Sequence, residues 1–271
     1  MLYYFLHKIL RIPLTMRVRY DRKVKNPENT IIFLHGIASS YNVWRATLQK
    51  LKQDPALDRT RIVALDLIGF GKSEKPEWFS YKYPDYHRSL RFTIRKLHIK
   101  TPIILAGHSM GCLIATDYAV TYPKKISAMI LVSPPFMRPS EISKLPDKFY
   151  RKTYTSLNEH TSDPIIGTLA KGGTKVSSFD NKALDTTAFR KSMEYIILNP
   201  NNWHTIKGVN IPTNIIHGNL DPLVFGANLR SLSKSNRHIK LTESVSAHDI
   251  KGPKLNKVVN NIKAILSELN A

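Results

Sequence analysis

The sequence predicts an α/β fold with a mostly parallel, twisted sheet, helices on both faces and an inserted helical cap. Short apolar runs of the buried-strand type recur along the chain and are separated by helix-sized intervals. Strands with this spacing are parallel and joined by crossover helices. The alternation breaks off after residue 135 and resumes near residue 211. We therefore expect residues 1–135 and 211–271 to form the core and residues 136–210 to form the cap.

The individual elements follow from the period of the apolar residues. Residues 14–20 alternate apolar and polar side chains, as does a strand with one face in water. A short strand is expected at residues 239–241. Buried strands are expected at residues 31–34, 62–65, 103–106, 128–132 and 213–216. Helices are expected at residues 43–53, 86–97, 112–122, 225–235 and 254–269, with cap pieces at 144–154, 163–170 and 187–198.

One strand runs into a helix through Gly107-His108-Ser109-Met110-Gly111, the Gly-x-Ser-x-Gly spacing of a nucleophile elbow. The turn is so sharp that Ser109 must adopt a strained backbone, with its hydroxyl pointing away from the sheet. Side chains at positions 107 and 111 would collide with the neighbouring strand and helix, so glycine is required there. The helix also directs free N–H groups toward negative charge formed at the turn. We expect Ser109 to act as a nucleophile.

A serine hydroxyl needs a base to take its proton, and imidazole is suited to this near neutral pH. Four of the ten histidines lie where parallel strands end or just before the last helix: His35, His108, His217 and His248. His35 and His217 each precede a glycine and are expected to brace loops. The His108 side chain is expected to point away from the site. His248 is therefore the expected base.

The acid that orients the imidazole is expected to be Asp221. It follows a strand and precedes His248, which gives the serine, acid, histidine order associated with the elbow. Asp66 and Asp249 are rivals. Asp66 is better placed to anchor its glycine-rich turn, and Asp249 adjoins His248 too closely to support the ring.

Acyl transfer also requires fixed N–H donors for the negative charge that forms on the carbonyl oxygen. The backbone of Met110, directly after the nucleophile, is expected to supply one donor. The loop after His35-Gly36 is expected to supply the other, from Ile37. No metal or organic cofactor is required for this chemistry.

With these residues in place, the chain resembles the α/β-hydrolase superfamily from about residue 14 to the C-terminus. Further matches are Trp44 downstream of His35-Gly36, the turn at residues 66–73, and residues 217–224. Relatives that open epoxides or remove halide carry aspartate at the elbow, and Ser109 argues against both. The loop at residues 37–40 differs from that of carbon–carbon hydrolases of ring-fission products and from that of lipases with consecutive glycines. The resemblance implies a small, cap-bearing, carboxylesterase-like serine hydrolase.

We therefore expect Ser109, His248 and Asp221 to cleave carboxylic esters of small or medium acyl compounds through an acyl-enzyme. Three alternatives stay open. The same residues would serve a carbon–carbon hydrolase of ring-fission products. A membrane-associated acylglycerol or phospholipid hydrolase would also use them. A non-catalytic ligand-binding protein could share the fold. The substrate and the oligomeric state are not fixed by the sequence.

Composition limits the partners and the compartment. Lys and Arg number 41 against 20 Asp and Glu, a formal charge of +21, yet no nucleic-acid motif accompanies them. A solvated basic surface is therefore expected rather than a nucleic-acid site. Cys112 is the only cysteine, which favours a reducing compartment, and we expect the cytoplasm. Residues 3–12 are too short to cross a bilayer and lack a cleavage site. Such a segment more often packs on its own domain or rims the entrance to a pocket, and the alternative is a short amphipathic helix that rests on an anionic membrane surface.

Overall fold

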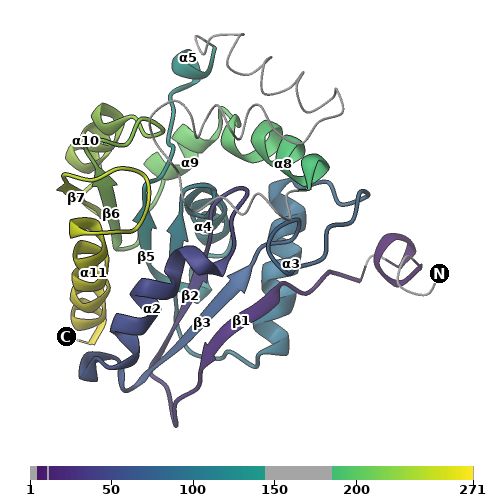
Figure 1. Ribbon diagram of the computed structural model, residues 1–271, viewed down its shortest axis with the longest axis horizontal. Helices are drawn as coiled ribbons and strands as arrows, with labels where there is room; N and C mark the ends of the chain where they lie inside the picture. Colours follow the sequence, from purple (N-terminus) through teal and green to yellow (C-terminus); the bar gives the residue numbers. More distant parts are fainter. Residues whose placement is uncertain (1–4, 11, 144–184, 271) are drawn as a thin grey trace.

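The computed structural model describes residues 5–10, 12–143 and 185–270. Its sheet has seven strands in the order β1-β3-β2-β4-β5-β6-β7 (Figure 1), and β1 is antiparallel to β3 while the other described pairs are parallel. The predicted α/β fold is confirmed. The strands are β1 (Arg17–Arg22), β2 (Asn29–Leu34), β3 (Thr60–Asp66), β4 (Ile103–His108), β5 (Ile126–Val132), β6 (Thr213–Gly218) and β7 (Ile239–Ser244).

Helices lie in the connections between strands from β2 onward, whereas β1 and β2 are joined by a short loop. The α-helices in the described part of the chain are α2 (Arg45–Lys52), α3 (Tyr83–Lys96), α4 (Met110–Thr121), α5 (Pro139–Ile142), α8 (Thr186–Ser192), α9 (Asn202–Lys207), α10 (Gly226–Ser235) and α11 (Pro253–Asn270). Short 3-10 turns occur at Tyr41–Trp44, Pro55–Leu57 and Pro123–Lys125, and π-helical turns at Phe5–Ile9 and Met193–Ile197.

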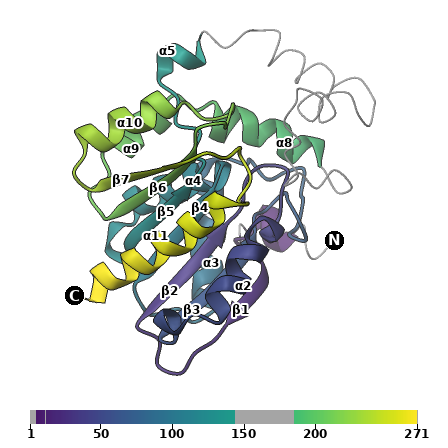
Figure 2. The same ribbon diagram turned by 60° about the vertical axis from the view of Figure 1, so that its left-hand side comes forward.

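The sheet lies between two apolar layers because its central strands are buried on both faces. In β2, Ile31 and Phe33 join one cluster, whereas Ile32 and Leu34 join the other, as the two-residue period of a strand requires. The first cluster is covered by α2 and α11, which Figure 2 shows together on one face of the sheet. The second is covered by α3, α4 and α10.

The carboxyl ends of β2, β4, β5 and β6 lie at one edge of the sheet because these strands are parallel and adjacent. Each strand therefore delivers the residues that follow it to the same place, which is where α/β sheets bind ligands. The expected site residues after β2, β4 and β6 thus share one edge.

The first strand begins later than residue 14, where it was expected. Leu14 and Met16 are buried, but the Met16 N–H donates to Thr93 Oγ1 at 2.9 Å and the Arg17 N–H to Ser73 Oγ at 2.8 Å. Side chains therefore take the place of the neighbouring strand as acceptors, and sheet pairing begins only where Arg17 meets Asp66.

The described end of the predicted cap packs on the core. Tyr86 of α3 shares a hydrogen bond of 3.1 Å with Ser192 of α8, and a Cβ at Gly69 would lie 2.7 Å from Ala188 Cβ. The piece expected at residues 187–198 is α8 followed by a π-helical turn. The pieces expected at 144–154 and 163–170 lie outside the described residues, so the cap boundaries 136–210 stay a prediction.

Candidate active site

Ser109 lies between the last residue of β4 and the first residue of α4, in a strained backbone conformation with φ 52° and ψ −121°. Its N–H donates to the carbonyl of Val132 at 2.9 Å, so β5 holds the turn in place. A non-glycine residue at such a positive φ costs on the order of 1–3 kcal/mol and is maintained only by its surroundings. The residue is 9% exposed.

Three glycines make this turn sterically possible. A Cβ at Gly107 would lie 2.6 Å from the nitrogen of Cys112, and a Cβ at Gly111 would lie 2.5 Å from the carbonyl oxygen of Leu34. Both obstacles are backbone atoms, which have little room to move. A Cβ at Gly36 would lie 2.9 Å from the Cβ of Ser109. The glycines predicted at positions 107 and 111 are thus required by close packing.

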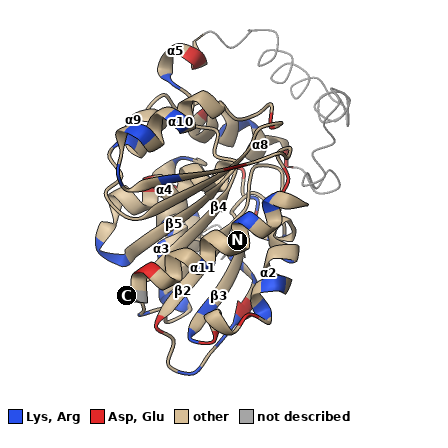
Figure 3. Cartoon of the chain, turned by 90° about the vertical axis from the view of Figure 1, so that its left-hand side faces the viewer, with Lys and Arg blue, Asp and Glu red and all other residues tan. Residues whose placement is uncertain are grey.

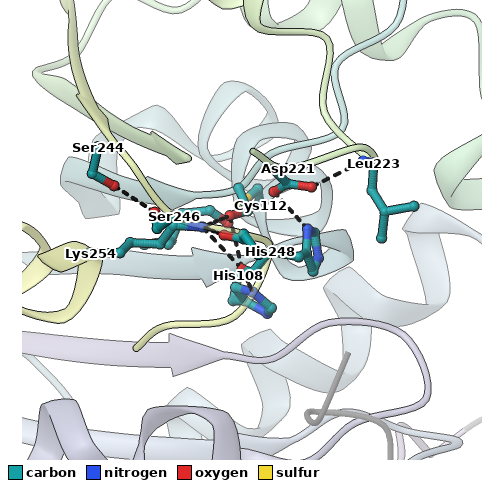
Figure 4. Close-up of polar contacts among 11 residues, drawn as sticks. His108, Cys112, Asp221, Leu223, Ser244, Ser246, His248 and Lys254 are labelled. Atoms are coloured by element: carbon teal, nitrogen blue, oxygen red, sulfur yellow. Dashed lines mark hydrogen bonds and ion pairs between the residues drawn. The ribbon is translucent and has the colours of Figure 1, made fainter. Parts of the chain in front are cut away.

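His248 and Asp221 are joined by a hydrogen bond of 2.8 Å between Nδ1 and Oδ2 (Figure 4). Burial alone would raise the pKa of Asp221. The hydrogen bond and positive charge of His248, with the N–H of Leu223 at 3.0 Å, outweigh burial and lower that pKa below its usual value. Asp221 is therefore ionised near neutral pH, and because a carboxylate can only accept, the Nδ1–H of His248 is the donor of this hydrogen bond.

The His248 ring lies at the elbow. Its centroid is 5.0 Å from that of His108, the residue before Ser109. Within the described residues, however, no hydrogen bond joins the Ser109 hydroxyl to His248. Hydrogen bonds of this kind tighten when a substrate binds.

The His108 side chain, which the sequence predicts to point away from the site, lies beside the backbone of the loop that carries His248. Its Nε2 is 3.3 Å from the carbonyl oxygen of His248, and its ring packs against Trp44 on the face covered by α2 and α11. The loop that leads into α11 crosses the same face, which is why the two histidines meet. Burial, then the positive charge of His248, lower the pKa of His108 to about 3, so His108 is neutral near pH 7.

The other candidates brace loops. His35 Nε2 accepts from the N–H of Leu67 at 2.9 Å. His217 lies against the start of α10, where a Cβ at Gly226 would be 2.7 Å from its Nε2. Asp66 accepts from the N–H groups of Tyr41 at 2.7 Å and Lys72 at 2.8 Å, which fixes the glycine-rich turn.

The two expected oxyanion donors follow β4 and β2. Met110 is the first residue of α4, and Ile37 follows Gly36, whose Cα faces Ser109. In the part of the chain that the structure describes, neither backbone N–H has an acceptor. The first N–H groups of a helix commonly have none within the helix itself. Among the same residues, no group of three or more His, Cys, Asp or Glu side chains is placed to hold a metal ion.

Sequence reasoning missed one residue near the site, Lys254, whose side chain is fully buried. A signal was available, since Lys254 precedes Val258 by four residues and Ile262 by eight, and so lies on the apolar face of the last helix. A basic residue in the first turn of a helix is also unfavourable for the helix dipole.

A sequence model of a family described by the alpha/beta hydrolase fold matches residues 29–250. The chain belongs to the α/β-hydrolase family. A solved esterase of this fold from Thermogutta terrifontis has a TM-score of 0.74 and 16% identity, with coverage of 95% of this chain and 98% of the esterase. At that identity, the likeness shows a shared fold alone.

Relatives within the family differ in chemistry. The probable lysophospholipase BODYGUARD 2 of Arabidopsis thaliana is 33% identical over 129 residues, which are 47% of this chain and 27% of the relative. The coelenterazine h 2-monooxygenase of Renilla reniformis is 34% identical over 113 residues, 42% of this chain and 35% of the relative. The matched part is about a quarter to a third of these relatives. Membership in the α/β-hydrolase family therefore fixes the fold, and the reaction has to be argued from the site.

Proposed function

We propose that this protein is a serine hydrolase that cleaves carboxylic esters of small or medium acyl compounds through an acyl-enzyme. The observation that supports it best is the hydrogen bond between His248 and an ionised Asp221, at the elbow that carries Ser109. An imidazole held by a carboxylate and a serine on a strained turn are parts that nucleophilic catalysis needs.

In this proposal, His248 Nε2 takes the proton of the Ser109 hydroxyl as Oγ attacks the ester carbonyl. Asp221 stabilises the imidazolium that results. The N–H groups of Ile37 and Met110 hold the negative charge that develops on the carbonyl oxygen. His248 then gives its proton to the departing alcohol. In the second half of the reaction, His248 takes a proton from the water molecule that attacks the acyl-enzyme and returns it to Ser109 as the acid leaves.

The test is covalent labelling of Ser109 by a fluorophosphonate, together with turnover of p-nitrophenyl esters of increasing chain length. We expect labelling and turnover by the wild type, and loss of both in Ser109→Ala. A dienoate ring-fission product in the same assays tests the carbon–carbon alternative, because its preferential cleavage would displace the ester assignment. A folded wild type that neither labels nor turns over any of these compounds would support a ligand-binding protein instead.

A lipid ester at a membrane surface is a second candidate substrate, favoured by the N-terminal segment. Seven large apolar side chains of the described residues are exposed, and four of them lie within residues 5–12: Phe5, Ile9, Leu10 and Ile12. The chain then enters β1, whose Arg17 pairs with Asp66 at the end of β3. The segment therefore leads into a strand that enters the sheet at the edge that carries the candidate site.

We propose that this apolar segment and the charge of +21 bind an anionic phospholipid surface. Sedimentation with vesicles of phosphatidylserine and phosphatidylcholine tests it. Replacing Phe5, Ile9, Leu10 and Ile12 with serine is expected to weaken binding by about 10-fold or more. The matched control replaces Val120 and Val245, which are exposed elsewhere. Equal binding by both variants would contradict a membrane role for the segment. No helix within the described residues is long and apolar enough to cross a bilayer.

The cytoplasm is the compartment we propose. The only cysteine, Cys112, is a buried free thiol, and burial raises its pKa well above the usual value, so it is unreactive. A chain without disulfides has no need of an oxidising compartment.

A further inference from the structure

Lys254 reaches from the first turn of α11 to the backbone of the loop that carries His248 (Figure 4). Its Nζ donates to Ser133 Oγ at 2.9 Å and to the carbonyl oxygen of His248 at 3.2 Å. The carbonyl of Ala247 accepts a third hydrogen bond. The ammonium group therefore uses two of its three donors on the loop that carries His248 and the third on Ser133, which follows β5.

Ser133, which follows β5, supports the same carbonyl. Its Oγ donates to the oxygen of His248 at 3.1 Å, and its own N–H donates to Ile216 of β6 at 2.8 Å. Ser133 has φ 52°, so the chain leaves β5 in a strained conformation that presents this hydroxyl. Lys254, Ser133 and His108 thus converge on one backbone oxygen.

Folding stability alone gives little reason to bury this lysine. Removing an ammonium from water is costly, and no carboxylate contacts Nζ in the described part of the chain. Asp221 after β6 and Asp249 in the same loop act on it from a distance, as do the rings of His108 and His217. Burial outweighs the two carboxylates and lowers the pKa of Lys254 to about 8.

We propose that Lys254, with Ser133, is a positioning residue that holds the backbone of Ala247 and His248 and thereby fixes the His248 ring against Asp221 and toward Ser109. This rests on the proposed function. A displacement of about 1 Å in a catalytic group costs about 100-fold in rate, so the position of this loop determines how well His248 removes the proton. Above about pH 8 the amine loses its charge and one of its donors, the loop loosens, and the rate falls.

The test compares Lys254→Met, Lys254→Arg and Ser133→Ala with the control Lys251→Met, which removes an exposed lysine of the same loop. Values of kcat and KM for a p-nitrophenyl ester are measured from about pH 6 to about pH 10. We expect Lys254→Met to lower kcat by about 10- to 100-fold with KM within about twofold and to abolish the decline above pH 8. Lys254→Arg should restore part of kcat and move the decline to higher pH. Ser133→Ala should give a smaller loss, and it tests the contact if Lys254→Met does not fold.

A folded Lys254→Met enzyme with the kcat and pH profile of the wild type would overturn the proposal. A second readout does not depend on catalysis: the NMR resonance of the His248 Nδ1 proton, which is hydrogen-bonded to Asp221. We expect it to shift near pH 8 in the wild type and in Lys251→Met, and not in Lys254→Met. If the wild type neither labels nor hydrolyses esters, the proposed function fails. The NMR result then tests the positioning role by itself. If the His248 Nδ1 resonance has the same pH dependence in the wild type and in Lys254→Met, the positioning role is overturned.

Discussion

Charge at the candidate site is confined to a few residues whose surroundings set their protonation. Asp221 is held ionised by His248, whereas His108 is held neutral by burial. Lys254 is charged below about pH 8. The proposed reaction requires His248 to take up and release the proton, and these neighbours surround it.

Asp221→Asn tests the orienting acid. The amide is expected to favour the wrong tautomer of His248 and to lower kcat by about 10,000-fold with the fold intact. Steady-state kinetics and circular dichroism measure the two effects. The matched control is Asp249→Asn, which removes the rival carboxylate next to His248. Its kcat is expected to stay within a few-fold of the wild-type value. Similar losses in both variants would remove Asp221 from its proposed role.

Lys254 also predicts a pH dependence of stability. Its pKa is about 8 in the folded protein against 10.5 as the ordinary value. Between these values the unfolded chain binds more protons, so the free energy of unfolding rises with pH by at most about 1.4 kcal/mol per unit. This rise in the free energy of unfolding between about pH 8 and 10.5 should be absent in Lys254→Met. Urea unfolding of both proteins at a series of pH values measures the difference, and parallel curves would exclude a buried charged lysine.

At the scale of elements, the strand β4, the turn at Ser109 and the helix α4 act as one unit because their backbones touch neighbouring strands. Gly111 faces the carbonyls of Leu34 and His35 at the end of β2, with 2.5 and 2.6 Å to a hypothetical Cβ. The elbow is therefore positioned by direct backbone packing against β2 as well as by its hydrogen bond to β5. This explains why its glycines could be predicted from the spacing alone.

Gly111→Ala is expected to destabilise the protein by about 3 kcal/mol, at the upper end of overpacking effects, because backbone atoms block the methyl group. Gly208→Ala is the control. Gly208 follows α9 with φ −83°, and its Cβ would meet nothing closer than 3.6 Å, so a change within about 1 kcal/mol is expected. Thermal unfolding measures both. Equal stability of the two variants would show that α4 can shift away from β2.

At the scale of the whole molecule, basic side chains are spread over many elements, among them α2 and α9 (Figure 3). The net charge of +21 is therefore a property of the surface rather than of one binding stripe. The positive electrostatic field of this surface attracts anionic surfaces. Salt shortens its range, because the Debye length falls from about 10 Å at 0.1 M to about 3 Å at 1 M.

Vesicle binding is accordingly expected to decrease steeply as sodium chloride rises from about 0.1 M to about 1 M. The residual binding at high salt should depend on Phe5, Ile9, Leu10 and Ile12. Sedimentation with the wild type and the four-serine variant at both salt concentrations separates the charge contribution from the apolar contribution. Binding that does not respond to salt would contradict the role of the basic surface.

The sequence by itself determined the fold class, most of the described strands and the elbow, because these depend on periods and spacings within short segments. The ends of elements were less well determined. The first strand was expected from residue 14, but side chains of Thr93 and Ser73 take the N–H groups of Met16 and Arg17. That contact joins residues far apart along the chain, and no local pattern encodes it.

The candidate site also has a part that the sequence predicts and a part that only the tertiary structure shows. The order of Ser109, Asp221 and His248 was visible in the sequence, and the structure joins the last two by a hydrogen bond. Only the tertiary structure placed His108 beside His248 and buried Lys254 under the same loop. These contacts arise where β4, β5, β6 and α11 pack together at one edge of the sheet. Packing of that kind depends on how separate elements meet in space, which residue periods do not specify.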